Sequence, residues 1–507
     1  MKGEPTLLAI DIGSSSVRCR LYGADLRGAG GGGAAVERYG WRTSGGAMEV
    51  DADELLAGVA RVVDAGLAAA RGSGAGIVAV APTTFWHSVV GLDVAGDPIT
   101  PLYGWGDSRA AAAAAELASR LEPSAYHQRT GCFLHASYPA AKLRWLRRAE
   151  PARFAAAALW GSFGEYLEWR LFGSPRCSLS IASGSGLLDA RTLEWDLETL
   201  EAIGVGADRL SALVNLEPRR GLTPGWAVRW PALADIPWFP ALGDGACANV
   251  GVGAVGHGRM GVTVGTSAAA RAVTEAAPAE VIPDDLWSYR LDARFRVAGG
   301  ALSNGGNGLA YLLERFPQLT LPEIDRALRE RTPDAHGLTV IPSLLAERGL
   351  GWADGAAATV AGLRPDTGPL DLAVAWIEAL SQRVAALVTR LESHFGEVAE
   401  LRATGGALHV LPGWLRTIAD AAGRPVRLAS HREATSRGAA IVAAREIGWL
   451  SSIAGPVEDA DSGELAMPAT THTRIHGDAL ARQRALAAAI GKTLNDPASS
   501  GARPPTT

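Results

Sequence analysis

The feature that most constrains the fold of this chain is a short pattern that occurs twice, about half a chain length apart. Residues 9–18 are AIDIGSSSVR and residues 261–271 are GVTVGTSAAAR, so each copy has an apolar stretch, a glycine and hydroxyl-bearing residues. A Gly-[Ser/Thr]-[Ser/Thr] triplet is common enough to recur by chance. If the recurrence is a true repeat, it predicts two similar α/β domains, and ligand sites often lie where two domains meet.

The length and composition suit a globular protein with two large domains or three smaller ones. The chain has 507 residues, of which 48% are hydrophobic and 20% are charged, close to the averages of soluble proteins. A net charge of -5 argues against a nucleic-acid binder, which usually carries a strong basic excess. The four cysteines show no CxxC spacing and the histidines no HExxH pattern, so we expect neither a zinc site nor a disulfide framework.

The first residues, MKGEPTLLAIDIG, have too short an apolar run for a signal peptide. No charge-free stretch of 18 apolar residues occurs, so we expect no membrane helix and a cytoplasmic protein. The repeat suggests an N-terminal domain over residues 1–250 and a C-terminal domain over 251–490. The segment 491–507 ends in NDPASSGARPPTT, which lacks an apolar period and is predicted to be a disordered tail.

Local patterns predict the main elements. Residues 7–11 are an apolar strand, and residues 17–21 alternate apolar and polar side chains, which predicts a β-hairpin. Residues 76–82 form another apolar strand. Helices are expected over residues 111–121, 138–148, 371–395, 412–422, 435–447 and near 478–494.

The turn of the first hairpin has the composition of an anion site. Gly13, Ser14, Ser15 and Ser16 bring backbone N–H groups and hydroxyls to one point without a bulky side chain. Asp11, at the end of the strand, could hold Mg²⁺ through water. The alternative is an ordinary polar turn. Gly265, Thr266 and Ser267 offer a second turn of the same kind, and two such turns could grip a triphosphate.

Asp244 stands between two glycines, directly before the small-residue helix ACANVGVGAV. Aspartate is a favoured N-cap residue, which is one interpretation. The other is a general base that accepts a proton from a substrate hydroxyl. The two roles are compatible.

His87 follows the apolar strand 76–82, and Trp105 and Asp107 occur in YGWGDSRA. A tryptophan face with a histidine and an aspartate suits a polyol, because the ring stacks on C–H faces and the polar groups bond hydroxyls. A histidine beside a core strand is otherwise usually structural.

Two glycine motifs remain. Gly405 and Gly406 precede the predicted helix 412–422 and could admit adenine against the backbone, although a plain strand-to-helix turn is equally compatible. Gly251, Gly253 and Gly256 match GxGxxG, but here a helix precedes the motif and a strand follows it, the reverse of the dinucleotide fingerprint. We therefore expect close packing at a helix exit.

Together these segments resemble the FGGY carbohydrate kinases, a family of the actin, hexokinase and Hsp70 ATPase superfamily. The resemblance rests on DIGSSSVR, WGDSRA, GDGACANVGVG, GVTVGTS, GGALSNGGNGLAYL and ATGGALHVLPGW in this order, over residues 6–447. It implies two ribonuclease-H-like α/β domains flanking a deep cleft, with ATP and Mg²⁺ as cofactors. A homodimer is compatible with the family.

The resemblance also implies roles for individual residues. Asp244 would be the catalytic base and would contact the substrate, and Asp11 would be the metal-associated aspartate. Sugar-binding residues would be His87, Trp105, Asp107 and His135. Nucleotide-binding residues would be Gly13, Ser14, Ser15, Ser16, Arg18, Gly265, Thr266, Ser267, Gly306, Gly405, Gly406 and Ala407.

Within the family, FWHSVVGLD, TGCFLHASYPAAKLRWL and SNGGNGLAYL look most like gluconokinases. Gluconate is therefore the leading substrate, and a xylulose, other pentulose, polyol or glycerol kinase is the alternative. A non-catalytic nucleotide-binding regulator is a third hypothesis, which the presence of both Asp11 and Asp244 disfavours. Trp86 departs from the family, where a Met or small residue is common, and could narrow the sugar pocket. Lys142 could face a carboxylate, but a surface position is expected.

Overall fold

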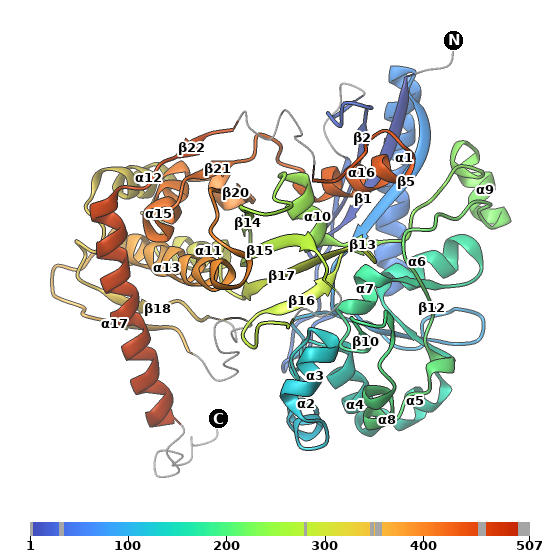
Figure 1. Cartoon of the computed structure of the whole chain (residues 1–507), viewed down its shortest axis with the longest axis horizontal. Coiled ribbons are helices and arrows are strands. Elements are labelled where there is room, and N and C mark those ends of the chain that lie inside the picture. The colour runs from blue at the N-terminus through green and yellow to red at the C-terminus, as the bar shows by residue number, and fades with distance from the viewer. Residues whose placement is uncertain are drawn as a thin grey trace. The chain divides into compact units, whose positions relative to one another are not determined.

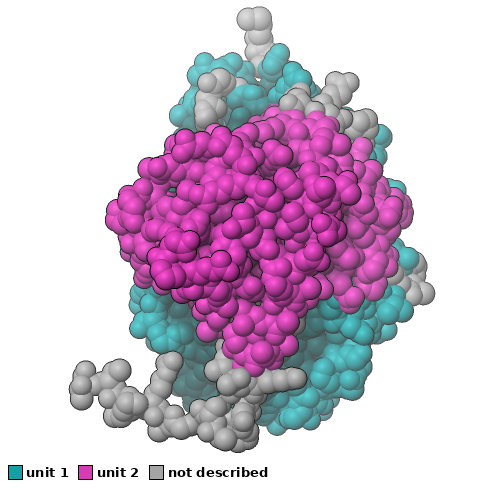
Figure 2. Space-filling view, turned by 90° about the vertical axis from the view of Figure 1, so that its left-hand side faces the viewer, with its two compact units in different colours: residues 1–256, 273–298, 433–456 teal, residues 257–272, 299–432, 457–507 magenta. Residues whose placement is uncertain are grey.

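The computed structural model describes residues 4–29, 35–277, 281–344, 349, 357–454 and 463–494. The chain divides into two compact units, coloured separately in Figure 2. Unit 1 comprises residues 1–256, 273–298 and 433–456, and unit 2 comprises residues 257–272, 299–432 and 457–507. A division of the chain at one point would therefore miss residues 273–298 and 433–456, which belong to unit 1 although they follow the first part of unit 2.

Unit 1 is built on a five-stranded sheet (Figure 1) with the strand order β13-β5-β1-β2-β3. The strands are β1 (Pro5–Ile12), β2 (Ser16–Tyr22), β3 (Ala35–Arg38), β5 (Gly76–Thr84) and β13 (Leu242–Gly243). β1, β5 and β13 run parallel, whereas β2 is antiparallel to both of its neighbours. The predicted first hairpin is confirmed, with Val17, Cys19 and Leu21 buried and Arg18 and Arg20 partly exposed between them.

Burial explains why β1 is an almost continuous apolar run. It lies between β2 and β5, and every residue after Pro5 is buried. Helix α1 (Ala52–Ser73) packs on β2 and β3, and α16 (Ala434–Glu446) packs on β1 and β5. Asp51 caps α1 by accepting from the N–H groups of Asp53 and Glu54.

Helices α10 (Asp244–Gly251) and α16 lie in backbone contact (Figure 1). A Cβ added to Gly251 would stand 1.8 Å from the carbonyl oxygen of Ala434, and one added to Gly438 would stand 1.8 Å from that of Cys247. The first glycine of the GxGxxG motif, Gly251, therefore allows close packing at the end of α10, whereas an added Cβ on Gly256 would meet no atom within 4 Å.

The other helices of unit 1 are α2 (Ala111–Ala118), α3 (Pro123–Thr130), α4 (Pro139–Ala149), α5 (Pro151–Ala156), α6 (Phe163–Phe172), α7 (Leu179–Ser183), α8 (Leu197–Ile203) and α9 (Pro224–Arg229). Of these, α6 packs on β5, whereas α2, α5 and α8 pack on α4. The short strand pairs are β4 (Glu49–Val50) with β7 (Leu102–Tyr103), β6 (Val90–Leu92) with β8 (Leu159–Gly161), β9 (Arg176–Ser178) with β12 (Ala212–Val214), and β10 (Leu188–Asp189) with β11 (Glu194–Trp195).

The sheet of unit 2 has the strand order β17-β15-β14-β20-β21-β22. The strands are β14 (Arg259–Val264), β15 (Ala268–Glu275), β17 (Phe295–Leu302), β20 (Glu400–Thr404), β21 (Val426–Leu428) and β22 (Leu465–Ala466). β15 and β17 pass into unit 1 at residues 273 and 298, and β16 (Trp287–Arg290), which pairs with β17, belongs to unit 1. β14 and β15 form an antiparallel hairpin, and β14 pairs with β20 in parallel, so the repeated pattern folds into the same local arrangement in both units.

The helices of unit 2 are α11 (Gly306–Arg315), α12 (Leu321–Glu330), α13 (Pro369–Phe395), α14 (Gly406–Val410), α15 (Pro412–Ala422) and α17 (Thr470–Leu494), and β18 (Thr339–Ile341) pairs with β19 (Thr359–Ala361). α13 is the one helix of the described residues that is long and apolar enough to cross a membrane, but 83% of its apolar window is buried. Its composition is therefore that of a core helix.

The six predicted helices are all present. Five of them begin or end within three residues of the predicted limits, and the last, α17, starts earlier than expected, at Thr470. α17 ends at Leu494, inside the segment predicted to be a tail, and residues 495–507 lie outside the described part of the chain.

Candidate active site

The two aspartates singled out in the sequence lie at one edge of the sheet of unit 1. In the parallel register, Asp11 of β1 faces Thr83 of β5, and Thr84 faces both Ile12 and Gly243. Asp244 follows Gly243 directly. Because the carboxyl ends of parallel strands meet at the same edge, the fold brings Asp11 and Asp244 together although they are far apart in sequence.

The carboxyl group of Asp11 is buried, with 7% of the residue exposed. Burial, together with the charges of Asp244 and Glu433, raises its pKa to about 7, and this value already includes the opposing effects of Arg18 and of the hydroxyl of Thr83. Thr83 donates to Asp11 Oδ1 over 3.2 Å. Two acidic groups that disfavour each other's ionisation form a site of negative potential, where a cation would be stabilised.

Asp244 is the first residue of α10, and its Oδ1 accepts from the N–H of Gly245 over 2.7 Å. The prediction that Asp244 is the N-cap is wrong by one residue, because Gly243 holds that position. A Cβ at position 243 would lie 2.1 Å from the ring of Trp86, so only glycine fits between the strand and the helix.

Trp86 itself is 6% exposed and donates from Nε1 to the carbonyl of Ser180 over 2.8 Å. Ser180 Oγ in turn accepts from the N–H of Gly243 over 3.0 Å. Trp86 therefore acts on the site by holding the backbone that precedes Asp244, rather than through a large exposed face.

The turn between β1 and β2 is fixed through its carbonyl groups. Gly13 N–H donates to Ser16 O over 3.0 Å. Tyr39 Oη donates to Gly13 O, and Trp41 Nε1 donates to Ser14 O, each over 2.6 Å. In a trans peptide the C=O and the next N–H point in opposite directions, so the N–H groups of Ser14 and Ser15 face away from these two rings. Backbone N–H groups of a turn can bind an anion, so this turn is compatible with the predicted phosphate contact.

Tyr39 and Trp41 were not among the residues predicted from the sequence. Their segment, ERYGWR, carries two aromatic side chains at alternate positions directly after β3, which is the only sequence signal for them. Arg18, predicted to bind nucleotide, forms an ion pair with Glu433 over 3.0 Å within unit 1.

The corresponding turn of unit 2 gathers all the predicted nucleotide residues of that unit. Gly265 N–H donates to Ser267 O over 2.9 Å, Gly306 N–H donates to Gly265 O over 2.7 Å, and Asn307 N–H donates to Thr266 O over 3.2 Å. α11 thus begins directly against the turn. A Cβ on Gly306 would lie 2.8 Å from Gly265 O, so the helix approaches this closely only because residue 306 is glycine.

The Gly-Gly segment before α14 reaches the same turn. Gly405 has φ of +118°, and a Cβ there would lie 2.2 Å from Val264 O. Ala407 lies on the other side, with its Cβ 3.6 Å from a Cβ added to Gly306. Thr266 and Gly406 are exposed, so this assembly of backbone groups opens to the surface of unit 2.

His87 lies in a strained and aromatic part of unit 1. It is one of four non-glycine residues with positive φ in the described chain, at +67°, and its Nδ1 bonds the carbonyl of Gly184 over 2.6 Å. Since a carbonyl only accepts, this bond places a proton on Nδ1. The ring meets Tyr138 and Tyr289 edge-on, at centroid distances of 4.8 and 5.6 Å.

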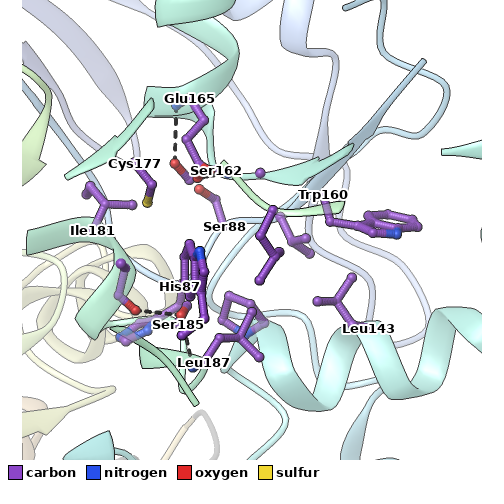
Figure 3. Close-up of a pocket in the computed structure, with 16 residues that line it drawn as sticks. His87, Ser88, Leu143, Trp160, Ser162, Glu165, Cys177, Ile181, Ser185 and Leu187 are labelled. Carbon is purple, nitrogen blue, oxygen red and sulfur yellow. Dashed lines mark hydrogen bonds between the residues drawn. The ribbon is translucent and has the colours of Figure 1, made fainter. Parts of the chain in front are cut away.

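His87 and Ser88 form one wall of a small cavity (Figure 3), with Glu165, Ser162 and Cys177 around it. Its volume is about 30 Å³, which has room for one or two water molecules and not for a sugar. This cavity is therefore not the sugar site.

The turn that carries Trp105 packs against Trp41, the residue that bonds the carbonyl of Ser14. A Cβ on Gly104 would lie 2.8 Å from the Trp41 ring, and that ring also meets Phe85 edge-on at 5.5 Å. Trp105 is partly exposed in this turn. Asp107 is 1% exposed, and its oxygens accept from Arg109 and from the N–H of Met48, so its contacts are those of a residue that holds the turn.

His135 lies in the loop before α4, where its Nδ1 accepts from the N–H of Ser137 over 3.1 Å. The surface position expected for Lys142 is wrong. Lys142 is fully buried, and its Nζ donates to the carbonyls of Ser137 and of His87, the latter over 3.3 Å. The amphipathic pattern of α4 does not show this, because one helix position can be covered by a loop far away in the sequence.

The described residues contain no group of three or more His, Cys, Asp or Glu side chains arranged for a metal ion. Mg²⁺ needs fewer protein ligands, because it is usually held by one or two carboxylates, phosphate oxygens and water. Asp11, which is buried, and Asp244, which is partly exposed, are compatible with that kind of site.

Comparison with known proteins agrees with this geometry. Residues 6–251 match the N-terminal domain, and residues 260–447 the C-terminal domain, of the FGGY family of carbohydrate kinases. A gluconokinase of Bacillus subtilis (strain 168) is 26% identical over 382 residues, 72% of this chain and 74% of that protein. A glycerol kinase of Geobacter sp. (strain M21) is 29% identical over 478 residues, 88% of this chain and 91% of that protein.

Among solved structures, a xylulose kinase from Lactobacillus acidophilus superposes with a TM-score of 0.87 at 20% identity, covering 96% of this chain and 98% of its own. The fold is thus the two-domain α/β fold of the actin and hexokinase ATPases. Members of the matched family transfer phosphate from ATP to sugar hydroxyls. With both family domains matched over most of its length, the chain belongs to the FGGY family of carbohydrate kinases, and it is an ATP-dependent sugar kinase.

Proposed function

We propose that this kinase phosphorylates one hydroxyl of gluconate or a closely related sugar acid, with Asp244 as the general base. The observation that carries the role of Asp244 is its place at the carboxyl edge of the sheet, after β13 and beside Asp11, whose pKa its charge raises. Gluconate is the leading substrate because a gluconokinase is among the relatives and because FWHSVVGLD and the segment around His135 look like that branch.

In the proposed reaction, Asp244 accepts the proton of the attacking hydroxyl while its oxygen bonds to the γ-phosphorus of ATP, and the bond to the β-phosphate oxygen breaks. The N–H groups of Ser14 and Ser15 stabilise the charge that develops on the transferred phosphoryl group. His87, Trp105 and His135 orient the sugar, and Asp107 holds the turn that carries Trp105.

Asp11 would hold Mg²⁺, which supplies charge neutralisation on the phosphate oxygens when it is bound. Its carboxyl group is buried with a raised pKa, so it gains more from a nearby cation than an exposed aspartate would. In unit 2, Gly265, Thr266, Ser267 and Gly306 would bind phosphate, and the turn at Gly405, Gly406 and Ala407 would bind adenosine. The proposal requires both sets of residues to act on one molecule of ATP.

The second candidate is a kinase of the same family that acts on xylulose, another pentulose, a polyol or glycerol. Two observations favour it: a glycerol kinase matches more of the chain than the gluconokinase does, and a xylulose kinase shares the fold. A non-catalytic nucleotide-binding regulator is the third candidate. We further propose a cytoplasmic location and a homodimer, on family grounds alone.

The first experiment measures ADP release from MgATP by the purified protein with gluconate, xylulose, ribulose, ribitol, xylitol and glycerol. Turnover on gluconate alone supports the leading proposal. Turnover on a ketose or polyol instead keeps the mechanism and overturns the substrate. ATP binding without turnover on any of the six favours the regulator.

Asp244→Asn tests the base. Turnover should fall by about 10²–10⁴-fold, the usual contribution of general base catalysis, while ATP binding stays nearly unchanged. Asp64→Asn is the matched control, since Asp64 is a surface carboxylate of the same unit that is 45% exposed and paired with Arg229. If the Asp244 variant turns over as fast as this control, Asp244 is not the base.

His87→Ala should raise the KM for the sugar more than the KM for ATP, because the proposed contacts of His87 are with the sugar alone. Equal increases in both constants would mean that His87 is a structural residue.

A further inference from the structure

Lys142 is unusual in both the sequence and the structure. The chain has 45 arginines and only three lysines, Lys2, Lys142 and Lys492. Among the described side chains Lys142 is the one lysine, and it has no exposed surface. In a chain that uses arginine for nearly every cation, a buried lysine marks a place where a compact ammonium with tetrahedral donors fits and a planar guanidinium does not.

The partners of the ammonium group show what it does there. Nζ donates to the carbonyl oxygens of His87 and of Ser137, which lie in two different segments. An apolar side chain of the same length would fill the space without the cost of burying a charge. What only the ammonium supplies is a pair of hydrogen bonds that joins the loop of His87 to the loop before α4.

Both loops carry residues assigned to the sugar. His87 has a φ of +67°, a conformation that costs free energy in a non-glycine residue unless its surroundings hold it. Its ring is held by Gly184 O, and its backbone carbonyl is held by Lys142. On the other side, Ser137 donates its N–H to His135 Nδ1, so the same ammonium group also fixes the loop of His135.

Aromatic contacts also connect the loop of His87 with the loop before α4. Tyr138, the residue after Ser137, meets the His87 ring edge-on, and its hydroxyl bonds that of Tyr289 over 2.7 Å. A shift of either loop would therefore change the orientation of the imidazole as well as its position.

We propose that Lys142 is a positioning residue for sugar binding, which acts by tying the carbonyl of His87 to the carbonyl of Ser137. The inference rests on the proposed contact of His87 with the sugar. In this proposal Lys142 acts on the sugar through the two histidines and not by direct contact.

The test is Lys142→Met, which keeps the length of the side chain and removes the donors. The KM for the sugar should rise about tenfold, as expected for the loss of hydrogen bonds from a charged donor, while the KM for ATP changes by less than about twofold. The matched control is Arg144→Met, which also removes a buried cation from α4 but whose partner is Glu116. This control should lower the thermal midpoint and leave the sugar KM unchanged.

A double-mutant cycle tests whether the effect passes through His87. In a His87→Ala background, Lys142→Met should raise the sugar KM by clearly less than it does in the wild type. Full additivity would overturn the proposal, as would an equal rise in both KM values or a rise with Arg144→Met as large as with Lys142→Met.

Lys142→Gln, which keeps an N–H donor without the charge, serves where the Met variant does not fold, and it should show a smaller rise in sugar KM. If neither variant folds, Lys142 is a folding residue and the proposal is overturned. If the wild type turns over a sugar and Lys142→Met leaves its KM unchanged, the positioning role fails and the proposed function stands. If the wild type neither binds nor phosphorylates any of the six compounds, the proposed function and the positioning role fail together.

Discussion

The two hairpins that carry the repeated sequence are fixed in different ways. In both hairpins the N–H of the turn glycine donates to a carbonyl two or three residues later. The first strand of each hairpin also pairs in parallel with a further strand. In unit 1, side chains hold the turn, because Tyr39 and Trp41 bond the carbonyls of Gly13 and Ser14. In unit 2 the turn is held by backbone contacts. The first residue of α11 donates its N–H to Gly265 O, and Gly405 lies against the backbone of Val264.

The difference extends to charge. Aligned on the turn glycines, Asp11 of the first hairpin corresponds to Thr263 of the second. Asp11 is a buried carboxyl beside another acid, whereas Thr263 accepts from Arg271 over 3.3 Å. We propose that the first hairpin holds a cation, whereas the turn of the second is packed closely against Gly306 and Gly405. The first should tolerate added side-chain volume and the second should not.

The largest effect is expected for Gly405→Ala. Alanine would have to adopt a φ of +118° and place its Cβ 2.2 Å from Val264 O, so β14 and α14 would be forced apart. We expect a loss of about 3 kcal/mol or more in the free energy of unfolding, together with loss of ATP binding. Thermal unfolding and nucleotide titration measure both.

Gly406→Ala is the matched control for that variant. It lies one residue further on, at negative φ and with no atom within 4 Å of an added Cβ. Its thermal midpoint should equal that of the wild type. Equal destabilisation by both substitutions would mean that the close approach of Gly405 to Val264 O does not determine the stability of this segment.

A direct contrast between the hairpins is Gly306→Ala against Gly13→Ala. In the first variant the Cβ lies 2.8 Å from Gly265 O, so the turn must move, and ATP affinity should fall about tenfold. In the second, the Cβ would stand 3.4 Å from Ser16 O, an ordinary contact, so the thermal midpoint should stay within about 1 °C. A stable Gly306→Ala protein with unchanged ATP affinity would contradict the proposed nucleotide role of the unit 2 turn.

A smaller effect is expected for Trp41→Phe, which keeps an aromatic ring and removes the donor to Ser14 O. The loss of one neutral hydrogen bond is worth about 1 kcal/mol, which corresponds to a rise of about fivefold in the KM for ATP. Trp226→Phe, at a partly buried tryptophan of the same unit, is the control. No rise with Trp41→Phe would mean that the first turn is rigid without its aromatic support.

The sequence predicts the skeleton of both hairpins because their signals are local. Strand alternation marks β2, the glycine marks each turn, and apolar periods mark α4, α13, α15 and α16. The order of the motifs also identifies the family, whereas the position of Asp11 beside Asp244 was found only in the pairing of β1, β5 and β13. Secondary structure that depends on residues close in sequence could therefore be predicted, and so could the family, which depends on the order of its motifs.

Contacts between distant segments could not. Nothing near Trp41 in the sequence indicates that its indole bonds Ser14 O, and nothing in α4 indicates that Lys142 reaches His87. The requirement for glycine at position 243 also comes from the ring of Trp86, more than 150 residues earlier in the sequence. Asp107 likewise has the residue type of a ligand, but its oxygens are taken by Arg109 and Met48.

The last contrast concerns pH and separates the hairpins by charge. Burial raises the pKa of Asp11 from 3.8 to about 7, so the folded state favours the protonated carboxyl. The contribution of this proton to the free energy of unfolding is fully present below about pH 4 and is lost as the pH rises through about 7. Without divalent cations and nucleotide, the thermal midpoint should therefore gain from Asp11→Asn at pH 8 relative to pH 5, because asparagine has no charge to bury. Thr263→Val, at the position of the second hairpin that corresponds to Asp11 and carries no carboxyl, should give the same change in midpoint at both pH values. If Asp11→Asn also gives the same change at pH 5 and pH 8, the carboxyl is ionised throughout this range, and the first hairpin is not the buried acidic site that sets it apart from the second.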